Sequence, residues 1–238
     1  MKISVSIIVP AYKEELFIKN AIEGLLTVFR DSNREFEIIT VIDEAPNDKT
    51  LEIIQDLEKT AKEIIIVSRK GKKGIGSAIR DGIKISTKDT ILITTAEISE
   101  DPSDLAKMLE KMDDGHDMVF GNRFYKNAKR ERYALKKYLG NRLCNYTIKI
   151  LFGIKSNDIT NGVKVYRSQI LKSMHTSSYG FEIFAEIPLK LYKKGFRNFV
   201  EIPITHKARS EMYSKFNLIK EGKRFFLTVL KCYLFNDK

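Results

Sequence analysis

The strongest constraint on the fold of this chain is a regular alternation of strand and helix patterns over about the first 120 residues. Short apolar runs typical of buried strands lie at residues 4–12, 36–43, 64–67, 91–93 and 117–121. Amphipathic stretches with three- and four-residue spacing separate them. The alternation predicts an α/β protein with a mostly parallel central sheet, right-handed crossovers and flanking helices.

Polar side chains gather where the fourth predicted strand ends. The apolar run at 91–93 is followed by Thr94-Thr-Ala-Glu-Ile-Ser-Glu-Asp101, and Pro102 then opens a helical pattern. Ligands of open α/β sheets bind beyond the carboxyl ends of the strands. Oxygen ligands at such a place suit Mg²⁺ or Mn²⁺ held against a diphosphate. The alternative interpretation is a polar loop that ends in a helix N-cap.

Positive charge is concentrated in two segments. The formal net charge is +11; residues 123–149 hold nine Lys/Arg and one acidic residue, and residues 207–238 hold eight Lys/Arg and three acidic residues. The rest of the chain is therefore close to neutral. A field of this kind attracts phosphates, in nucleic acids, in lipid headgroups or at a membrane surface. No nucleic-acid recognition module accompanies it, so nucleic acid is not an expected partner.

Both basic segments contain amphipathic helical patterns. Residues 133–152 carry Leu135, Leu139 and Leu143 at four-residue steps, and residues 216–233 carry a second apolar stripe beside lysines and arginines. No apolar run reaches 18 residues, so no transmembrane domain is expected. Basic amphipathic helices of this type lie on anionic membranes. Packing of both stripes on the domain is the alternative.

Other classes of protein find little support. The N-terminus leads directly into a strand pattern, without the features of a signal peptide. Two distant cysteines and three scattered histidines form no zinc motif and indicate free thiols in the cytosol. No Ser/His/Asp or Cys/His set is evident.

Three short motifs suit a nucleotide site at the carboxyl edge of the sheet. Pro10-Ala-Tyr-Lys-Glu14 follows the first predicted strand, and Asp43-Glu44 ends the second. Carboxylates there can accept hydrogen bonds from a base or a ribose. The loop Gly71-Lys-Lys-Gly-Ile-Gly76 has neither P-loop nor dinucleotide spacing, but it lets a diphosphate approach a helix N-terminus. An ordinary tight turn is the alternative for this loop.

The order of these motifs resembles inverting glycosyltransferases of family 2, which have the GT-A fold. The resemblance is carried by Val9-Pro-Ala-Tyr-Lys-Glu14, Ile42-Asp-Glu-Ala-Pro-Asn-Asp-Lys-Thr50, Lys73-Gly-Ile-Gly-Ser-Ala78 and Gly121-Asn-Arg123. Later segments are similar to the dolichyl-phosphate mannose synthase branch: Asp158-Ile-Thr-Asn-Gly162, Gly180-Phe-Glu-Ile-Phe-Ala-Glu186, Glu201-Ile-Pro-Ile-Thr-His-Lys-Ala-Arg209 and Ser214-Lys215. Together they cover about residues 4 to 216.

The resemblance implies a role for each matching position. The nucleotide-binding residues implied are Pro10, Tyr12, Glu14, Asp43, Lys73, Gly74, Gly76 and Ala96. The metal motif falls on Thr95-Ala96-Glu97, with Ser99 as a further ligand. Arg123 is implied to contact the lipid phosphate, while Arg209 and Lys215 neutralise phosphates from a late loop. The catalytic set is therefore Glu97, Arg123, Arg209 and Lys215, with Mg²⁺ or Mn²⁺ as the cofactor.

The sequence departs from the family pattern at two places. Thr95 replaces the first aspartate of the metal motif, and a neutral hydroxyl is a poor ligand for Mg²⁺. Met212 stands where the family has a glycine before its Ser-Lys pair. The sequence therefore leaves open whether Thr95-Ala96-Glu97 still binds metal.

The resemblance implies a reaction that needs no side-chain base. A polyprenyl or dolichyl phosphate, already anionic, attacks the anomeric carbon of GDP-mannose or a UDP-hexose with inversion, while metal and cations stabilise the leaving diphosphate. Asp158 is expected to orient an arginine or a sugar hydroxyl, or to cap a turn. Two alternatives remain: a family 2 transferase acting on a lipid-linked glycan or polysaccharide, and a non-catalytic relative that binds nucleotide sugar.

These interpretations predict a single catalytic domain over residues 1–238. Its parts are a nucleotide-sugar half at 1–122, an acceptor half at 123–215 and an amphipathic helix at 216–238. The expected location is the cytoplasmic face of a membrane, with an anionic lipid surface and a possible membrane-protein partner.

Overall fold

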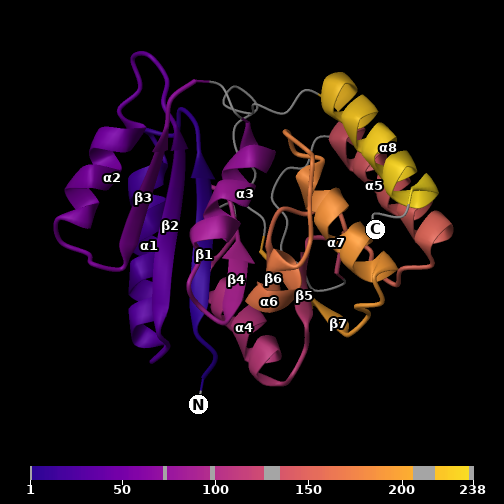
Figure 1. Ribbon diagram of the computed structural model, residues 1–238, viewed down its shortest axis with the longest axis horizontal. Coiled ribbons are helices and arrows are strands. Elements are labelled where there is room, and N and C mark those ends of the chain that lie inside the picture. The colour runs from indigo at the N-terminus through magenta and orange to yellow at the C-terminus, as the bar shows by residue number, and fades with distance from the viewer. Residues whose placement is uncertain (1, 72–73, 97–99, 126–134, 206–217, 236–238) are drawn as a thin grey trace.

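The described strands form one seven-stranded sheet in the order β3-β2-β1-β4-β6-β5-β7, with helices on both faces (Figure 1). The computed structural model describes residues 2–71, 74–96, 100–125, 135–205 and 218–235. The strands are β1 Val5–Ala11, β2 Phe36–Asp43, β3 Ile64–Arg69, β4 Thr90–Ile93, β5 Met118–Asn122, β6 Lys164–Arg167 and β7 Phe199–Pro203. Only β6 of these runs antiparallel to its neighbours, β4 and β5. The predicted mostly parallel sheet is confirmed.

Helices connect the strands as the alternation predicts. They are α1 Ile18–Asp31, α2 Thr50–Glu58, α3 Ile75–Ile85, α4 Pro102–Asp113, α5 Leu135–Phe152, α6 Ser168–Lys172, α7 Ile183–Lys193 and α8 Leu218–Leu234. Buried residues of α1 and α4 pack in one cluster with one face of the sheet, while α3, α6, α7 and inner residues of α5 and α8 pack in a second. The sheet is therefore covered on both faces over its central strands.

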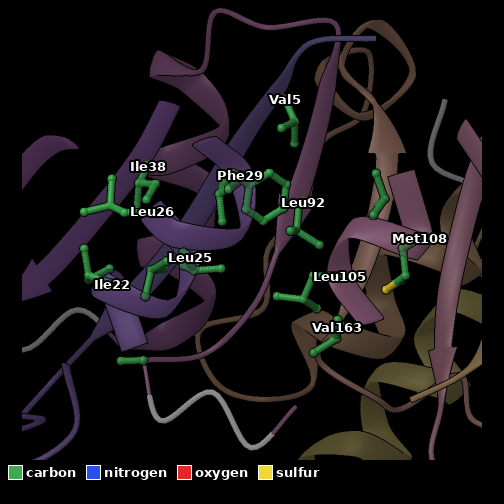
Figure 2. Packing of buried hydrophobic residues seen from close by; sticks show 14 of the residues in the cluster. Val5, Ile22, Leu25, Leu26, Phe29, Ile38, Leu92, Leu105, Met108 and Val163 are labelled. Carbon is green, nitrogen blue, oxygen red and sulfur yellow. The ribbon is translucent and has the colours of Figure 1, made fainter. Parts of the chain in front are cut away.

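Side-chain alternation divides the strand residues between these two clusters. On β1, Ile7 and Val9 lie in the cluster with α1, and Ile8 lies in the other. On β4, Leu92 belongs to the first cluster and Ile91 to the second. Figure 2 shows Leu92 beside Phe29 of α1 and Leu105 of α4. Because both faces are covered, the strands read as continuous apolar runs.

The switch in strand order places a candidate ligand edge between β1 and β4. The chain proceeds outward from β1 to β2 and β3, and then returns to the other side of β1 as β4. Ligands of open α/β sheets bind at the carboxyl ends of the strands beside such a switch. This edge is where the sequence predicts nucleotide and metal contacts.

Two further expectations can be compared with the described residues. Among their helices, none has the length and apolar content needed to cross a membrane. Cys144 and Cys232 are both free thiols, and burial raises the pKa of Cys144 to about 11. At neutral pH Cys144 is therefore a protonated and poorly nucleophilic thiol.

Candidate active site at the carboxyl edge of the sheet

The turn after β1 presents one aromatic ring at the ligand edge. Pro10 is buried within β1, whereas Tyr12 is 43% exposed. Glu14 is buried; its amide donates to Thr50 Oγ1 at 2.8 Å. The carbonyl of Glu14 accepts the amide of Ile18 at the start of α1. The chain thus turns into α1 with the Tyr12 ring at the surface and Glu14 inside.

Asp43 ends β2 in a closed ionic network. Its Oδ1 accepts from Arg69 Nε at 2.8 Å, and its Oδ2 accepts from the amide of Gly74 at 3.1 Å. Arg69 also contacts Asp81 Oδ2 through Nη1 at 2.9 Å, and both the Asp43 and Arg69 side chains are more than 90% buried. The network fixes the start of the glycine loop against the end of β2. Sequence reasoning missed Arg69, although it ends the strand next to β2.

The glycine loop packs against a distant backbone segment. The amide of Gly76 donates to the carbonyl of Tyr179 at 2.8 Å. A Cβ at Gly76 would lie 2.2 Å from the carbonyl oxygen of Ser178, and Gly74 has φ = +78°. Both glycines are therefore required by local backbone geometry. Two amides near the N-terminus of α3 are already bonded within the protein, which limits how much of this terminus a phosphate can use.

The polar stretch after β4 contains both a helix cap and an unpaired hydroxyl. Asp101 is the N-cap of α4 and accepts from the amide of Ser103 at 2.9 Å, which confirms the cap interpretation for this residue. Thr94 Oγ1 is fully buried without a hydrogen-bond partner in the described part of the chain. Ala96 is also buried, at 2% exposure. Thr94 is thus an oxygen available beside the switch point.

The described residues alone do not fit a divalent metal. Across residues 2–71, 74–96, 100–125, 135–205 and 218–235, no group of three His, Cys, Asp or Glu side chains is arranged to hold one. Glu97 and Ser99 lie outside the described residues, as do Lys73, Arg209 and Lys215. The neutral Thr94 hydroxyl cannot hold a dication by itself.

A clamped arginine follows β5 at the same sheet edge. Arg123 donates to Asp158 through Nε at 2.9 Å and Nη2 at 2.8 Å, and its amide also donates to Asp158 Oδ2 at 2.9 Å. The Asp158 side chain is fully buried, and that of Arg123 is 13% exposed. This two-point geometry is strong and directional. Asp158 therefore orients an arginine, which is one of the roles that the sequence left open.

Arg123 and Asp43 lie on one edge but do not touch. Asp43 ends β2 and Arg123 follows β5, four strand spacings away in the sheet order. At about 4.8 Å per spacing, the separation along the edge is roughly 19 Å. The two groups can therefore contact different parts of one extended ligand, or two different ligands.

A buried lysine lies behind this clamp. Lys164 begins β6, is 1% exposed, and donates through Nζ to the carbonyl of Asn161. Burial lowers the pKa of Lys164 to about 7; Asp158 and Glu201 oppose this shift, and Arg123 adds to it. Sequence reasoning missed this residue. The signal that the sequence offers is the position of this lysine between two valines, Val163 and Val165.

The segment that carries Asp158 is bonded to α5. Asn145 and Asn141 of α5 donate to Thr160 Oγ1 at 3.0 and 2.9 Å, and Arg142 donates to the carbonyl of Asn157 at 2.8 Å. The guanidinium of Arg142 also lies 4.8 Å from the centre of the Phe124 ring, and Phe124 directly follows Arg123 in the sequence. The clamp and α5 are therefore parts of one local structure.

Helices α5 and α8 lie side by side at one end of the sheet (Figure 1). Both helices carry exposed apolar side chains. Each helix also has a buried face, which includes Ile148 of α5 and Val229 of α8. We call the exposed set the open face; its members are Leu135, Leu139, Leu143, Tyr146, Ile150, Phe226, Leu227, Leu230, Tyr233, Leu234 and Phe235. The predicted stripe of α5 therefore does not pack on the domain. Residues up to 217 of the second predicted stripe lie outside the described part.

The sheet order and its polar edge define an α/β protein with the GT-A type of fold. The structure is similar to glucosyl-3-phosphoglycerate synthase from Mycobacterium tuberculosis in complex with UDP, with a TM-score of 0.74, 15% identity and coverage of 99% of this chain and 82% of that one. A complex of that synthase with Mn²⁺, UDP-glucose and glycerol 3-phosphate gives a TM-score of 0.71 at 14% identity, with the same coverage of 99% and 82%. At such low sequence identity, these structural similarities establish the fold alone.

Sequence comparison identifies the family. The chain belongs to glycosyl transferase family 2, whose model matches residues 6–174. It is 29% identical over 95% of its length to a dolichol-phosphate mannosyltransferase of Pyrococcus furiosus, and 26% identical over 96% to glycosyltransferase AglJ of Haloferax volcanii. An undecaprenyl-phosphate 4-deoxy-4-formamido-L-arabinose transferase of Edwardsiella ictaluri is 24% identical over 91%. The chain spans 64%, 71% and 64% of these relatives, respectively.

Proposed function

We propose that this chain transfers a sugar from GDP-mannose or a UDP-hexose to a dolichyl or other polyprenyl monophosphate, with inversion at the anomeric carbon. Membership of family 2 supports sugar transfer, and two relatives are named for polyprenyl-phosphate acceptors. The observation that carries the proposal is the Arg123–Asp158 clamp, which lies at the ligand edge and is joined to a helix of the open face. A phosphate-binding cation next to an apolar surface suits a phosphate on a lipid.

The reaction requires little proton chemistry from the protein. An oxygen of the acceptor phosphate attacks the anomeric carbon as the bond to the nucleoside diphosphate breaks, so the leaving group takes the electron pair. The acceptor is already an anion at neutral pH, and no side chain needs to deprotonate it. Arg123 holds that phosphate, while Tyr12 and the Asp43 side of the edge contact the donor. Arg209 and Lys215 neutralise phosphate charge.

A divalent cation, Mg²⁺ or Mn²⁺, is part of this proposal through Glu97 and Ser99. Its support is the pair of family positions and the Mn²⁺ complexes of a protein with the same fold. When bound, such an ion supplies charge stabilisation to the leaving diphosphate. Isothermal titration of the nucleoside diphosphate with and without Mn²⁺, on the wild type and Glu97→Ala, tests this assignment; equal affinities in all four titrations contradict it.

The open face lies on an anionic lipid bilayer at the cytoplasmic side. Its apolar side chains are flanked by basic residues of the same two helices, including Lys136, Lys149, Lys223 and Lys231. Apolar insertion and attraction of lysines to anionic lipid act together in such helices. In this arrangement residues 1–122 bind the donor, residues 123–215 bind the acceptor, and residues 216–238 hold the protein on the membrane.

Transfer of labelled sugar to polyprenyl phosphate in vesicles tests the activity. A donor panel of GDP-mannose and several UDP-hexoses identifies the nucleotide, and Arg123→Met tests the clamp. Loss of one charge-assisted contact predicts roughly a 10- to 100-fold fall in kcat/KM for the acceptor. Arg197→Met is the matched control, because Arg197 is exposed just before β7, at the opposite sheet edge. Nucleotide binding without turnover for any donor indicates the non-catalytic alternative.

Flotation with vesicles tests the membrane surface. Leu139→Glu combined with Phe226→Glu places two charges in the open face and is expected to abolish binding to vesicles that contain anionic lipid. Leu16→Glu is the control, because Leu16 is also exposed, at 62%, but precedes α1. Binding of the double variant at the wild-type level contradicts the lipid assignment, as does an oligomer formed through this face that persists after vesicles are added.

A further inference from the structure

Lys164 is a buried cation in an apolar and aromatic setting. Its Nζ lies 5.8 Å from the centre of the Phe120 ring and 6.0 Å from that of Phe184, and it donates to the carbonyl of Asn161. Ile93 is its strand neighbour on β4. An ammonium group so far from water is stable only if nearby carbonyls, rings or carboxylates compensate its charge.

The charged groups that act on Lys164 come from three directions. Asp158 lies in the loop before β6, Arg123 follows β5, and Glu201 belongs to β7. From α7 the facing group is the uncharged ring of Phe184. Glu201 is held by neighbours of the clamp: it accepts from Asn122 Nδ2 at 2.8 Å and from the amide of Asn157 at 3.0 Å. With Lys164 charged, these two cations and two anions balance; with Lys164 neutral, the cluster carries one negative charge.

A phosphate that docks on Arg123 changes this balance. It brings negative charge to the cation that already engages Asp158, and the field of that charge favours the protonated form of Lys164. We propose that Lys164 is a positioning residue that takes up a proton from the solution when a phosphate binds at Arg123, and thereby balances the charge beneath the acceptor site. This inference rests on the proposed function, in which Arg123 holds the acceptor phosphate.

The protonation state of Lys164 changes in the range where this coupling matters. Because burial lowers its pKa to about 7, Lys164 is partly neutral in the free protein at neutral pH. Binding and protonation are reciprocal, so an anion that raises the pKa of Lys164 binds more tightly when Lys164 is charged. Acceptor affinity is therefore expected to fall as the pH rises above about 7, by roughly tenfold for a coupling of one pKa unit.

The acceptor phosphate also titrates near neutral pH, so the test compares variants on one substrate. The acceptor KM is measured between about pH 6 and pH 8.5 for the wild type, Lys164→Met and Lys164→Arg. The acceptor KM of Lys164→Met divided by that of the wild type is expected to be about ten near pH 6 and to approach one near pH 8.5. Lys164→Arg stays charged, so its acceptor KM is expected to remain lower than that of Lys164→Met at every pH. Lys19→Met, at an exposed lysine of α1, controls for loss of a lysine as such.

Calorimetry gives a second readout that needs no turnover. A short-chain polyprenyl phosphate is titrated into each protein at about pH 7.5, in buffers with different ionisation enthalpies, which reports the protons taken up on binding. The wild type and Lys19→Met are expected to take up an additional fraction of a proton relative to Lys164→Met. This readout remains decisive if the arginine of Lys164→Arg does not fit its buried site.

The outcomes separate the two levels of the argument. Acceptor binding with equal proton uptake in the wild type and Lys164→Met, or a KM ratio that is constant with pH, overturns the role of Lys164 alone. Acceptor binding that Arg123→Met leaves intact shows that the phosphate is elsewhere. Absence of acceptor binding by the wild type refutes the proposed function and this inference together.

Discussion

The burial of Lys164 makes the stability of the free protein depend on pH in a calculable way. In the unfolded chain this lysine has the ordinary value of 10.5, whereas burial lowers its pKa to about 7 in the folded protein. Between these values the unfolded state binds more protons than the folded state. The free energy of unfolding therefore rises with pH across this window, and the full penalty of burying the lysine applies below the folded pKa.

The size of the effect follows from linkage. Each pKa unit corresponds to about 1.4 kcal/mol, so the penalty below pH 7 is roughly 5 kcal/mol. Near the folded pKa the free energy of unfolding changes with pH at less than the full slope, because Lys164 is then only partly deprotonated in the folded protein. About 2 kcal/mol of the penalty is removed between pH 7 and pH 9. The perturbation is Lys164→Met, which fills similar space and has no titrating group. Its stability relative to the wild type is expected to fall by about 2 kcal/mol over that interval.

Urea denaturation at several pH values measures this difference. Subtracting the two curves removes the contribution of all other groups that titrate in the same range, and only the change with pH is predicted. The absolute difference also contains the lost Asn161 contact and the unbalanced carboxylates. The pH dependence of Lys19→Met is expected to follow that of the wild type. Parallel curves for the wild type and Lys164→Met would refute the argument that Lys164 loses its proton on folding.

Three further predictions concern local geometry. Gly76→Ala places a Cβ 2.2 Å from the carbonyl oxygen of Ser178 and is expected to destabilise the protein by about 2–3 kcal/mol and weaken donor binding, measured by denaturation and nucleotide titration. Gly222→Ala, where nothing lies within 4 Å, is the matched control and is expected to stabilise α8 by roughly 1 kcal/mol. Asp101→Ala removes the acceptor of the Ser103 amide and is expected to lower the thermal stability by about 1 kcal/mol; an unchanged melting temperature would show that the cap is replaced. Thr94→Val removes a buried hydroxyl without a partner in the described residues and is expected to raise stability by about 1 kcal/mol in the free protein, whereas a loss of stability would reveal a hydrogen bond to this hydroxyl.

The parallel part of the fold could be predicted because its physical signal is strong. The strands β1, β2, β4 and β5 are buried almost throughout, the edge strand β3 is an apolar run that is partly buried, and amphipathic helices separate these strands. β6 was missed because it is short, runs antiparallel and begins with a lysine. A lysine in a strand normally faces water, and only the covering of both sheet faces makes Lys164 a core residue. That covering depends on α7, which is distant in sequence.

The candidate site was predictable in its parts and not in its connections. The placement of Asp43 and Arg123 at one sheet edge follows from parallel strands. The sequence did not determine which side chain pairs with Arg123, because Asp158 is 35 positions away and its side-chain direction depends on a loop. The pairing of Gly76 with Tyr179 spans more than a hundred residues and involves only backbone atoms. Sequence patterns report periodicity within an element, and they carry little information on such long-range backbone contacts.

The open face of α5 and α8 also determines how the protein behaves away from lipid. The exposed leucines and aromatic rings of these two adjacent helices are unfavourable in water, so in solution they promote self-association. Bilayer binding and aggregation are then competing ways to remove the same surface from water. The lipid-to-protein ratio determines which of the two processes dominates. Purification without lipid or detergent is expected to give oligomers that dissociate when vesicles are added.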